Sequence, residues 1–489
     1  MLDRTESSTY PYNHLTQSPV NRFIVSMTIW TPELVKDRPA YQALADAIAA
    51  DRASGSLPAG AQLPPHRALA HALGVTVGTV TRGYGEAARR KLVRGEVGRG
   101  TYVLDPSPPE LLDTRFARRE AVVDDILNLT ITRPASDRLT ESLSRGLSDL
   151  SAANLSSLVS YGPAEGGPNH RAAVSDWLRA SSVQIGPEQV IICNGAQNGL
   201  ALACAGLLKP GDAVAVDDMT YPGFKAAANM FGLRLLAVAS DDQGMTPEGL
   251  GVAAKAGARA VYLMPTLHNP TMQTIPLNRR QDLAIVAEAA DLLIIEDDVY
   301  GFLEPDHPTH FATLAPERTA LVGGVSKFMA PALRIGWIAP PAARVAEVEP
   351  AIRGLSWMAS PLTAHMVASA MVTGEAESLA EAQRDEARVR LKMVQASLGP
   401  WLPNSPLPDC AMHVWLSLPE PWRADEFVAE ALTRKLAISP AGAFAVGRGH
   451  APHAIRFGLG AHSRDALAKG LSIMADLLDA KPRAGMAVV

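Results

Sequence analysis

The sequence is poor in cysteine and in aromatic residues, and it contains no long apolar run. Three of its 489 residues are cysteines, without CxxC spacing, which indicates neither a disulfide framework nor a zinc site and fits a reducing cytoplasm. No stretch approaches the roughly 18 apolar residues of a membrane span, residues 1–30 lack the apolar core of a signal peptide, and the histidines show no metal-ligand spacing. We therefore expect a cytoplasmic protein, neither secreted nor anchored, without a metal and with residues 1–30 as a disordered tail.

The composition that is present is that of a large globular chain with an uneven charge. Hydrophobic residues make up 47% and charged residues 19% of the sequence, and this length predicts two to four structural units. Residues 1–104 hold 12 Lys/Arg against 8 Asp/Glu, a net charge of +4, whereas the remainder holds 33 against 42, a net charge of −9. A small basic front before a large acidic body is a weak indication of a polyanionic partner.

Residues 31–104 have the pattern of three helices closed by a hairpin. Apolar residues recur at i, i+3, i+4 and i+7 over residues 41–48, which predicts the first helix. A second helix is expected over residues 65–73, where Gly74 is suited to end it. A third helix follows after a short turn, and two strand-like runs around a Gly-rich turn predict a hairpin over residues 92–104.

The third helix has two unlike faces. The inward stripe is expected to contain Val80, Tyr84, Ala87 and Ala88. The outward face is expected to carry Thr79, Arg82, Arg89 and Arg90. A helix, a short turn and a helix let the second helix enter a DNA major groove, and a following hairpin would form a wing. An ordinary three-helix bundle has the same periodicity, so periodicity alone leaves both interpretations open.

Particular residues of this unit carry a resemblance. They are Tyr41, Leu44-Ala45, Ile48, Gly60, Leu63-Pro64-Pro65-His66-Arg67, Leu69-Ala70, Leu73-Gly74-Val75, Thr79-Val80, Tyr84 and Gly98-Arg99-Gly100-Thr101-Tyr102-Val103. This pattern resembles the winged helix-turn-helix domain of GntR-type transcription factors. The resemblance implies contacts to double-stranded DNA from Arg67, Thr76, Thr79, Arg82, Arg99 and Gly100, residues that suit phosphates, base edges or close backbone approach. Val77 and Gly78 depart from the polar or basic residues of many relatives, so base recognition there is expected to be weak or of another kind.

The chain changes character after the hairpin. Residues 105–125 begin with a proline-rich run and continue with charged residues, which predicts a linker. Over residues 126–489, short apolar runs alternate with Ala-rich helical stretches. The runs are Val190–Cys193, Ala213–Val216, Ala260–Leu263, Leu292–Ile295 and Ala320–Val322. Strands that are apolar on both faces and separated by helices predict an α/β domain with a mainly parallel sheet.

Ligands of α/β sheets gather at the carboxyl ends of strands, so the residues after each run are informative. A small-residue turn, residues 194–200, leads into a helix and suits a phosphate, although such turns are often only tight connections. Glu296-Asp297-Asp298 follows the next-to-last run, and Ser326-Lys327 lies shortly after the last one. A lysine near a buried carboxylate and a phosphate cradle suggests imine chemistry, because a neutral ε-amine attacks aldehydes.

A larger set of residues resembles the fold type I, class I/II aminotransferases over roughly residues 126–480. The set is Tyr161, Gly166-Gly167, His268-Asn269-Pro270-Thr271, Glu296-Asp297-Asp298-Val299-Tyr300, Ser326-Lys327, Pro331, Leu333-Arg334 and Gly336-Trp337. The resemblance implies a large domain with a mainly parallel central sheet, a smaller C-terminal α+β subdomain and pyridoxal 5′-phosphate as cofactor.

The resemblance also implies roles at the site. Lys327 would bear the cofactor as an internal aldimine, Asp297 would pair with the pyridine nitrogen, and Asn269 and Tyr300 would bond the phenolic oxygen. Tyr221 would lie against the ring, and the phosphate would be held by Ala196, Gln197, Ser326 and Arg334. Tyr161 would reach the phosphate of a neighbouring subunit, and Arg456 would bind the α-carboxylate of an amino acid. Gly324 stands where a phosphate-binding hydroxyl is frequent, so one bond to the cofactor is expected to be missing.

The two domains together resemble the MocR subfamily of bacterial transcriptional regulators. That resemblance implies a homodimeric regulator whose aminotransferase-like domain senses a small amine or amino-acid effector through external aldimine formation at Lys327. A catalytically active aminotransferase with a residual DNA-binding domain is the alternative, because every residue needed for transamination is present. A third interpretation makes the basic front a protein-interaction module, which suits the apolar Val77-Gly78 pair.

Overall fold

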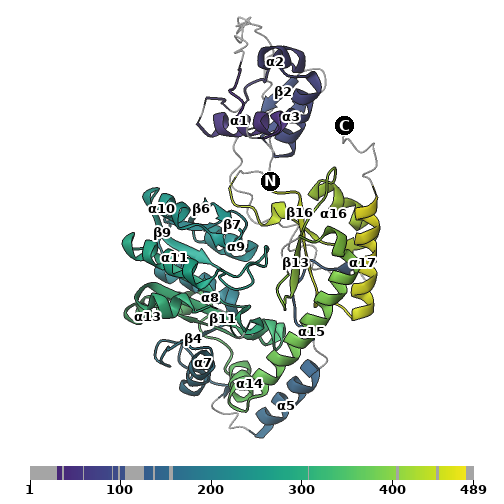
Figure 1. Cartoon of the computed structure of the whole chain (residues 1–489). Helices are drawn as coiled ribbons and strands as arrows, with labels where there is room; N and C mark the ends of the chain where they lie inside the picture. Colours follow the sequence, from purple (N-terminus) through teal and green to yellow (C-terminus); the bar gives the residue numbers. More distant parts are fainter. Residues whose placement is uncertain are drawn as a thin grey trace, which may run out of the picture. The chain divides into compact units, whose positions relative to one another are not determined.

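The computed structural model describes residues 30–35, 38–54, 56–58, 60–90, 92–96, 100–104, 126–135, 138–152, 158–304, 306, 308–403, 407–447 and 451–480. The contacts divide the chain into two compact units, residues 1–109 and 110–489 (Figure 1). Nearly all of the predicted N-terminal tail, and the whole of the predicted linker, lie outside the described residues. No helix in the described ranges is long and apolar enough to cross a membrane.

The first unit is built from three helices and a hairpin, as its periodicity predicts. The helices are α1 (Ala40–Ser54), α2 (His66–Leu73) and α3 (Val77–Arg89), and β1 (Val93–Glu96) pairs antiparallel with β2 (Gly100–Val103). Gly74 ends α2 with a left-handed φ of 64°, a conformation open to a residue without Cβ. The Thr76 hydroxyl caps α3 by accepting the Thr79 N–H at 3.1 Å.

Two details of the predicted helix faces are wrong. Ala88 is exposed, and the Arg90 side chain is turned inward with 12% of its surface exposed. Arg90 donates to Glu86 at 2.9 Å and to Asp46 of α1 at 2.6 Å. Glu86 is itself buried, and a buried carboxylate requires a paired cation, which explains the inward turn of Arg90.

The second unit is centred on a seven-stranded sheet with the order β4-β12-β11-β10-β9-β5-β6. The strands are β4 (Ile191–Cys193), β5 (Ala213–Asp217), β6 (Arg234–Val238), β9 (Ala258–Leu263), β10 (Leu293–Asp297), β11 (Thr319–Gly324) and β12 (Gly336–Ala339). All five predicted strands are present, and β12 runs antiparallel to both of its neighbours while the other pairs are parallel. The expected mainly parallel α/β fold is therefore confirmed.

Helices cover both faces of this sheet (Figure 1). On one face α8 (Ala196–Leu207), α9 (Pro222–Met230) and α13 (Val345–Leu355) pack on alternate strand residues such as Val214, Tyr262 and Ile295. On the other face α10 (Pro247–Lys255) and α11 (Leu277–Ala289) pack on the intervening residues, such as Ala215 and Val261. Side chains of successive strand residues point to opposite faces, which explains strands that are apolar throughout.

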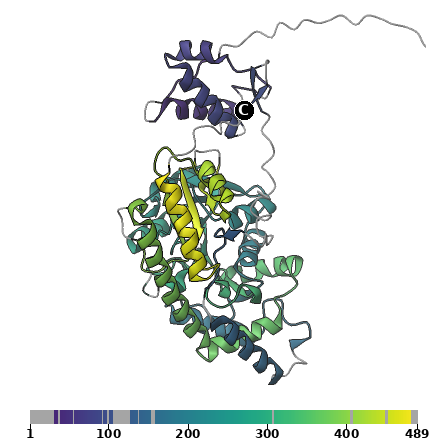
Figure 2. The same ribbon diagram turned by 90° about the vertical axis from the view of Figure 1, so that its right-hand side faces the viewer.

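The C-terminal part forms the smaller α+β subdomain. Strands β13 (His413–Ser417), β15 (Ser439–Pro440) and β16 (Ala454–Gly458) make an antiparallel sheet, and α15 (Glu375–Leu398), α16 (Ala424–Thr433) and α17 (Arg464–Asp479) share its apolar core (Figure 2). A short strand β3 (Leu127–Asn128) pairs with β14 (Leu436–Ala437). The chain that follows the predicted linker is thus built into this subdomain. The other helices of the unit are α5 (Arg138–Ala152), α7 (Pro168–Ala180), α12 (Phe311–Leu314) and α14 (Pro361–Val372).

Candidate functional site

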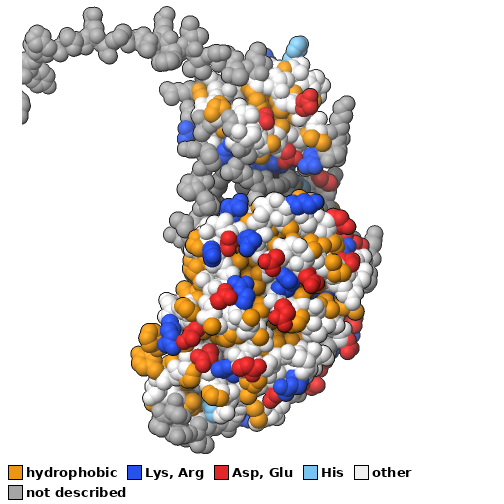
Figure 3. Space-filling view, turned by 90° about the vertical axis from the view of Figure 1, so that its left-hand side faces the viewer, with side chains coloured by type: hydrophobic (Ala, Val, Ile, Leu, Met, Phe, Trp, Pro, Cys, Tyr) orange, Lys and Arg blue, Asp and Glu red, His pale blue; other side chains and the backbone are white. Residues whose placement is uncertain are grey.

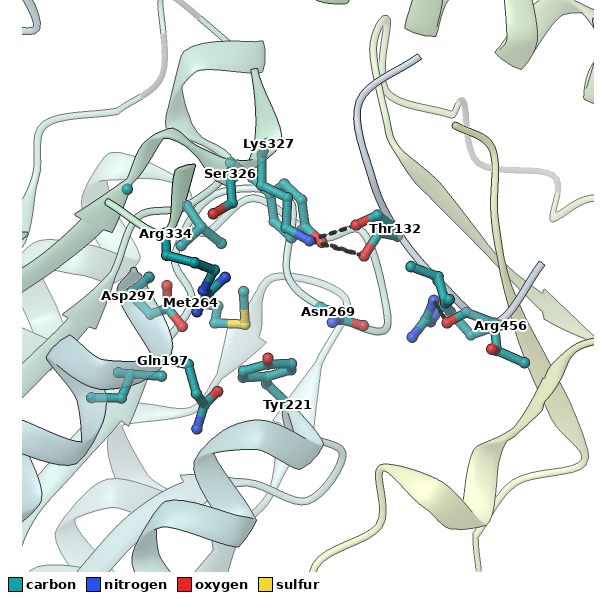
Figure 4. Close-up of a pocket in the computed structure, with 17 residues that line it drawn as sticks. Thr132, Gln197, Tyr221, Met264, Asn269, Asp297, Ser326, Lys327, Arg334 and Arg456 are labelled. Atoms are coloured by element: carbon teal, nitrogen blue, oxygen red, sulfur yellow. Dashed lines mark hydrogen bonds between the residues drawn. The ribbon is translucent and has the colours of Figure 1, made fainter. Parts of the chain in front are cut away.

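A cavity of about 290 Å³ lies at the carboxyl ends of the sheet strands, and the C-terminal subdomain supplies part of its wall (Figure 4). Most of the residues assigned to a cofactor or effector line it: Ala196, Gln197, Tyr221, Asn269, Asp297, Tyr300, Ser326, Lys327, Arg334 and Arg456. These residues come from positions spread over 260 residues of the chain. The strand-end rule explains most of this meeting, since these residues, apart from Arg456, end a strand of the central sheet or lie in the connections at the strand ends.

One end of the cavity is suited to an anion. The first-turn amides of α8, at Ala196 and Gln197, border it, and the Arg334 guanidinium lies beside them and donates to Asn194 O at 3.1 Å. A Cβ on Gly195, whose φ is 84°, would lie 2.7 Å from that guanidinium. Glycine here therefore lets a cation lie against a helix N-terminus, where unpaired N–H groups and the helix dipole already favour negative charge.

Gly324 contributes to the same close packing. A Cβ on it would lie 3.2 Å from Gly336 Cα and 3.3 Å from the Ala196 amide nitrogen. The strand end is packed tightly against the start of α8, so a hydroxyl-bearing side chain at position 324 would require the backbone to shift. Glycine at position 324, which is expected to cost one bond to the cofactor phosphate, thus also allows this close packing.

Lys327 ends a short 3-10 helix (Val325–Lys327) directly after β11. Its Nζ donates to Thr132 O at 2.6 Å and to Thr132 Oγ1 at 3.3 Å. Burial, together with the nearby Arg456 cation, lowers the pKa of Lys327 to about 8. A lower pKa leaves more of the amine neutral near physiological pH, which is the form that attacks a carbonyl carbon.

Two carboxylates at the end of β10, Asp297 and Glu296, have different environments. Asp297 lines the cavity, and burial raises its pKa to about 7. Asp297 Oδ2 accepts from Tyr262 OH at 2.8 Å, and its buried Oδ1 has no partner among the described residues. Glu296 points to the other face of the sheet, where it accepts from the amides of Phe311 at 3.1 Å and Ala312 at 2.9 Å. Glu296 therefore stabilises the fold, whereas its neighbour Asp297 presents an oxygen without a hydrogen-bond partner at the cavity.

Asn269 and Tyr300 also line the cavity. The Asn269 Oδ1 atom is buried without a hydrogen-bond partner in the described chain. Tyr300 OH donates to Thr132 Oγ1 at 3.3 Å. Tyr221 precedes α9, and the Gln197 side chain donates to Gly223 O at 2.7 Å, which ties the tyrosine-bearing turn to α8.

Arg456 brings the C-terminal subdomain into the site. It lies in β16 with only 3% of its surface exposed, and its guanidinium carbon is 5.2 Å from the Phe444 ring centroid. Its Nη1 donates to Thr130 O at 2.9 Å, and its buried Nε has no partner in the part of the chain that is described. A buried guanidinium with unused donors is suited to a carboxylate.

Tyr161 lies outside the cavity of its own chain. It is 83% exposed, and its ring contacts Trp357 edge-on at 6.0 Å between centroids. Its assignment to a neighbouring subunit's phosphate remains a prediction.

The residues assigned to DNA lie on the surface of the first unit. Arg67, Thr76, Arg82 and Gly100 are exposed, Thr79 is half-buried, and Arg99 lies outside the described residues. The hydroxyls of Thr76 and Thr79 are 2.9 Å apart, and the Arg82 guanidinium is 5.5 Å from the Tyr41 ring centroid. On the second unit, acidic and basic side chains are interspersed over the face shown in Figure 3.

Several cavity residues were not predicted. Thr130, Ile131 and Thr132 line the cavity from the segment after the predicted linker, which follows no strand of the central sheet and contains no motif residue. Met264 also lines it, and inspection of the residue after the Ala260–Leu263 run would have found this one.

Two known families match separate parts of the chain. Residues 124–473 match the family described as aminotransferase class I and II, and residues 40–103 match bacterial regulatory proteins of the gntR family. The class I and II aminotransferase match implies pyridoxal 5′-phosphate as cofactor, and the unpaired oxygens of Asp297 and Asn269, the Lys327 amine and the anion end of the cavity fit that group.

Some relatives match this chain over both of these regions. An uncharacterized HTH-type transcriptional regulator, YdeF of Bacillus subtilis, is 27% identical over 94% of this chain and 99% of its own length. The HTH-type pyridoxine biosynthesis transcriptional regulator PdxR of Corynebacterium glutamicum is 29% identical over 87% of this chain and 92% of its own. The structure of the α-aminoadipate aminotransferase LysN from Thermus thermophilus covers 74% of this chain and 94% of its own, with a TM-score of 0.67 and 24% identity, and shows the fold. The chain belongs to the class I and II aminotransferase family, and its gntR-type region gives it the domain architecture of the MocR regulators.

Proposed function

We propose that this chain is a DNA-binding transcriptional regulator that works as a homodimer. In this proposal the aminotransferase-like domain senses an amine or amino acid through external aldimine formation at Lys327. The observation that carries the proposal is the pair of hydrogen bonds from Lys327 Nζ to Thr132, because Thr132 lies seven residues after the end of the predicted linker. The two full-length relatives described above are named as transcriptional regulators, which supports the same role.

Pyridoxal 5′-phosphate supplies a reactive aldehyde and an electron-withdrawing ring. Asp297 Oδ1 would accept from the ring nitrogen, and Asn269 and Tyr300 would bond the phenolic oxygen. The α8 amides, Ser326 and Arg334 would hold the phosphate. Since Asp297 and Asn269 are buried with unused oxygens, binding of this group would satisfy atoms whose desolvation is otherwise uncompensated.

Arg456 is the residue that would distinguish amino acids from simple amines. Its Nη1 is bonded to Thr130 O, so an effector carboxylate would compete with that carbonyl for the same guanidinium. Charge-assisted bonds are stronger than bonds to a neutral carbonyl, which favours the carboxylate. Effector binding would therefore loosen one attachment of the Thr130 segment.

The same segment also contacts the reactive lysine. A free Lys327 amine, neutral or protonated, has N–H groups to donate to Thr132, whereas a lysine nitrogen bound to the cofactor in a neutral imine would have none. The states with and without effector would thus differ in the bonds that residues 130–132 accept from Lys327 and Arg456. In the sequence, these residues follow β3, which itself follows the predicted linker. Such a difference in contacts is what an effector needs in order to shift the population of two domain arrangements.

Two exposed aromatic residues support the homodimer. Tyr161 is 83% and Trp357 is 52% exposed, and they lie against each other on the surface of the second unit. Large aromatic side chains are enriched at protein interfaces. A dimer would also carry two gntR-type units and could address two DNA half-sites.

Aminotransferase activity is a second candidate function, and the low pKa of Lys327 favours it. A lysine amine that is readily neutral can also remove the α-proton of a bound amino acid. The residues that bind a substrate and those that bind an effector would be the same.

One experiment tests both functions. The full chain is loaded with pyridoxal 5′-phosphate, and candidate amines are screened by the absorbance of the bound cofactor, whose band changes when the imine partner is exchanged. Binding to promoter DNA from the gene's own neighbourhood is measured with and without each amine. The proposal expects DNA binding whose affinity or pattern changes with an amine that alters the spectrum. Absence of DNA binding at moderate salt in every ligand state would exclude the regulator, and multiple-turnover formation of a keto acid would establish the enzyme.

A further inference from the structure

Tyr262 places a polar group in an otherwise apolar position of the central sheet. It lies in β9 and is fully buried, and its neighbours on the same strand face, Ala260 and Met264, belong to the apolar core. Burying a hydroxyl without a partner is costly, so phenylalanine would be expected here unless the hydroxyl is used. Its hydroxyl is used, because it donates to Asp297 Oδ2 at 2.8 Å.

The sheet register brings these two residues together. Tyr262 of β9 is paired with Ile295 of β10, and Asp297 lies two residues further along β10 on the same face. The Tyr262 ring is also stacked on Phe224 of α9, with centroids 3.8 Å apart and planes 2° from parallel. The strand pairing and the stacked ring leave the hydroxyl little freedom, so its direction toward Asp297 is fixed by the fold.

We propose that Tyr262 is a positioning residue that acts on the cofactor through Asp297. By occupying Oδ2, the tyrosine hydroxyl fixes the carboxylate plane and leaves the unpartnered Oδ1 to accept from the ring nitrogen. This inference rests on the cofactor that family membership implies, and it is independent of the proposed regulatory role. Second partners of this kind orient a ligand-binding group and tune its basicity.

The pKa values of Tyr262 and Asp297 predict which way the loss of the tyrosine hydroxyl would change cofactor binding. Burial, with the adjacent Asp297 carboxylate, raises the pKa of the Tyr262 hydroxyl well above its ordinary value, so the tyrosine keeps its proton and remains a donor. Burial raises the pKa of Asp297 to about 7, and the bond from Tyr262 opposes this rise because it stabilises the charged form. Without the hydroxyl, more Asp297 would be protonated at neutral pH, and a neutral carboxyl no longer offers a charge to a protonated ring nitrogen.

The test is Tyr262→Phe in the full chain, which keeps the ring and its stacking on Phe224. We expect the dissociation constant for pyridoxal 5′-phosphate to rise about tenfold, since hydrogen bonds to charged groups typically contribute this much or more. The pH below which cofactor binding weakens should also move upward. Tyr84→Phe is the matched control, because it removes another buried hydroxyl bond, to Pro64 O at 2.7 Å in the first unit, and should leave both quantities unchanged.

A second pair of variants separates this role from a general loss of packing. In an Asp297→Asn background the group has no charge to preserve, so adding Tyr262→Phe should change cofactor affinity less than twofold. Effects that add fully in the double variant would overturn the proposal, as would a Tyr262→Phe protein with the original affinity and pH profile. Tyr262→Phe could lower the melting temperature of the cofactor-free chain. The comparison of Asp297→Asn with the double variant still tests the positioning role, because cofactor binding is measured at a temperature where both proteins are folded.

Discussion

The cavity of the second unit and the outward face of α3 in the first unit hold their polar groups in opposite ways. In the cavity, Asp297 Oδ1, Asn269 Oδ1 and Arg456 Nε are buried and have no partner in the described chain. At the start of α3, the exposed hydroxyl of the capping residue Thr76 is within hydrogen-bond distance of Thr79, and the Arg82 guanidinium of α3 lies over an aromatic ring. Buried unpaired groups cost free energy until a ligand arrives, whereas exposed groups are satisfied by water or neighbours. A small-molecule site can therefore be recognised from its unsatisfied atoms, and a DNA-binding face cannot.

The arginines of the first unit differ in whether they are paired with carboxylates. Part of its basic excess is directed inward, since Arg90 is paired with Glu86 and Asp46, and Arg89 is paired with Glu86 as well. These ion pairs take two of the twelve cations of residues 1–104 away from phosphates, and they cancel within its net charge, which remains a modest +4. Because nonspecific DNA affinity grows with the number of phosphate contacts, two such units in one dimer would be required for tight binding.

The largest expected effect changes the cavity and leaves the proposed DNA-binding face unchanged. Lys327→Ala removes the amine that would form the imine, so covalent attachment of pyridoxal 5′-phosphate should be abolished. Borohydride reduction followed by mass spectrometry would measure the attachment, with exposed Lys209→Ala as the control. DNA affinity in the absence of effector should stay within about twofold. A reduced adduct on another lysine would refute the assignment of Lys327.

A smaller effect is expected on the exposed face. Arg67→Ala combined with Arg82→Ala should weaken DNA binding, and the slope of log K against log salt should fall by about one to two, since each lost phosphate contact removes ~0.9. Arg38→Ala removes a cation that is paired with Asp46 at 2.9 Å on the same unit, so it should change the slope less. Binding of the cofactor should be unaffected in both variants. An unchanged slope in the double variant would mean that these arginines do not contact phosphates.

The two regions also differ in what the sequence could predict. The sheet and its strands could be predicted from the apolar runs, and the resemblance to aminotransferases indicated ten residues that line the cavity, most of which meet because the sheet brings strand ends together. Thr130 and Thr132 could not, because their approach to Arg456 and Lys327 depends on the pairing of β3 with β14, more than 300 residues away. Tyr262 looked like an ordinary strand aromatic, and only the register of β9 with β10 reveals its bond to Asp297. The inward turn of Arg90 was hidden for a similar reason, since its partner Asp46 lies in another helix.

The smallest expected effect is a pH shift that links the subdomain to the reactive lysine. Burial and the Arg456 cation lower the pKa of Lys327 to about 8, so Arg456→Gln should raise that pKa toward the ordinary lysine value. The amine is neutral only above its pKa, so the rate at which the cofactor-free chain captures pyridoxal 5′-phosphate should need a higher pH to reach half its maximum. Stopped-flow absorbance between pH 6.5 and 10 (~0.5 unit steps) would measure this midpoint, and Arg388→Gln, an exposed arginine paired with Asp385 in the same subdomain, is the control. A midpoint that stays in place would mean that Arg456 does not lower the lysine pKa, and the cavity would then lack an electrostatic connection between Arg456 and the lysine that binds the cofactor.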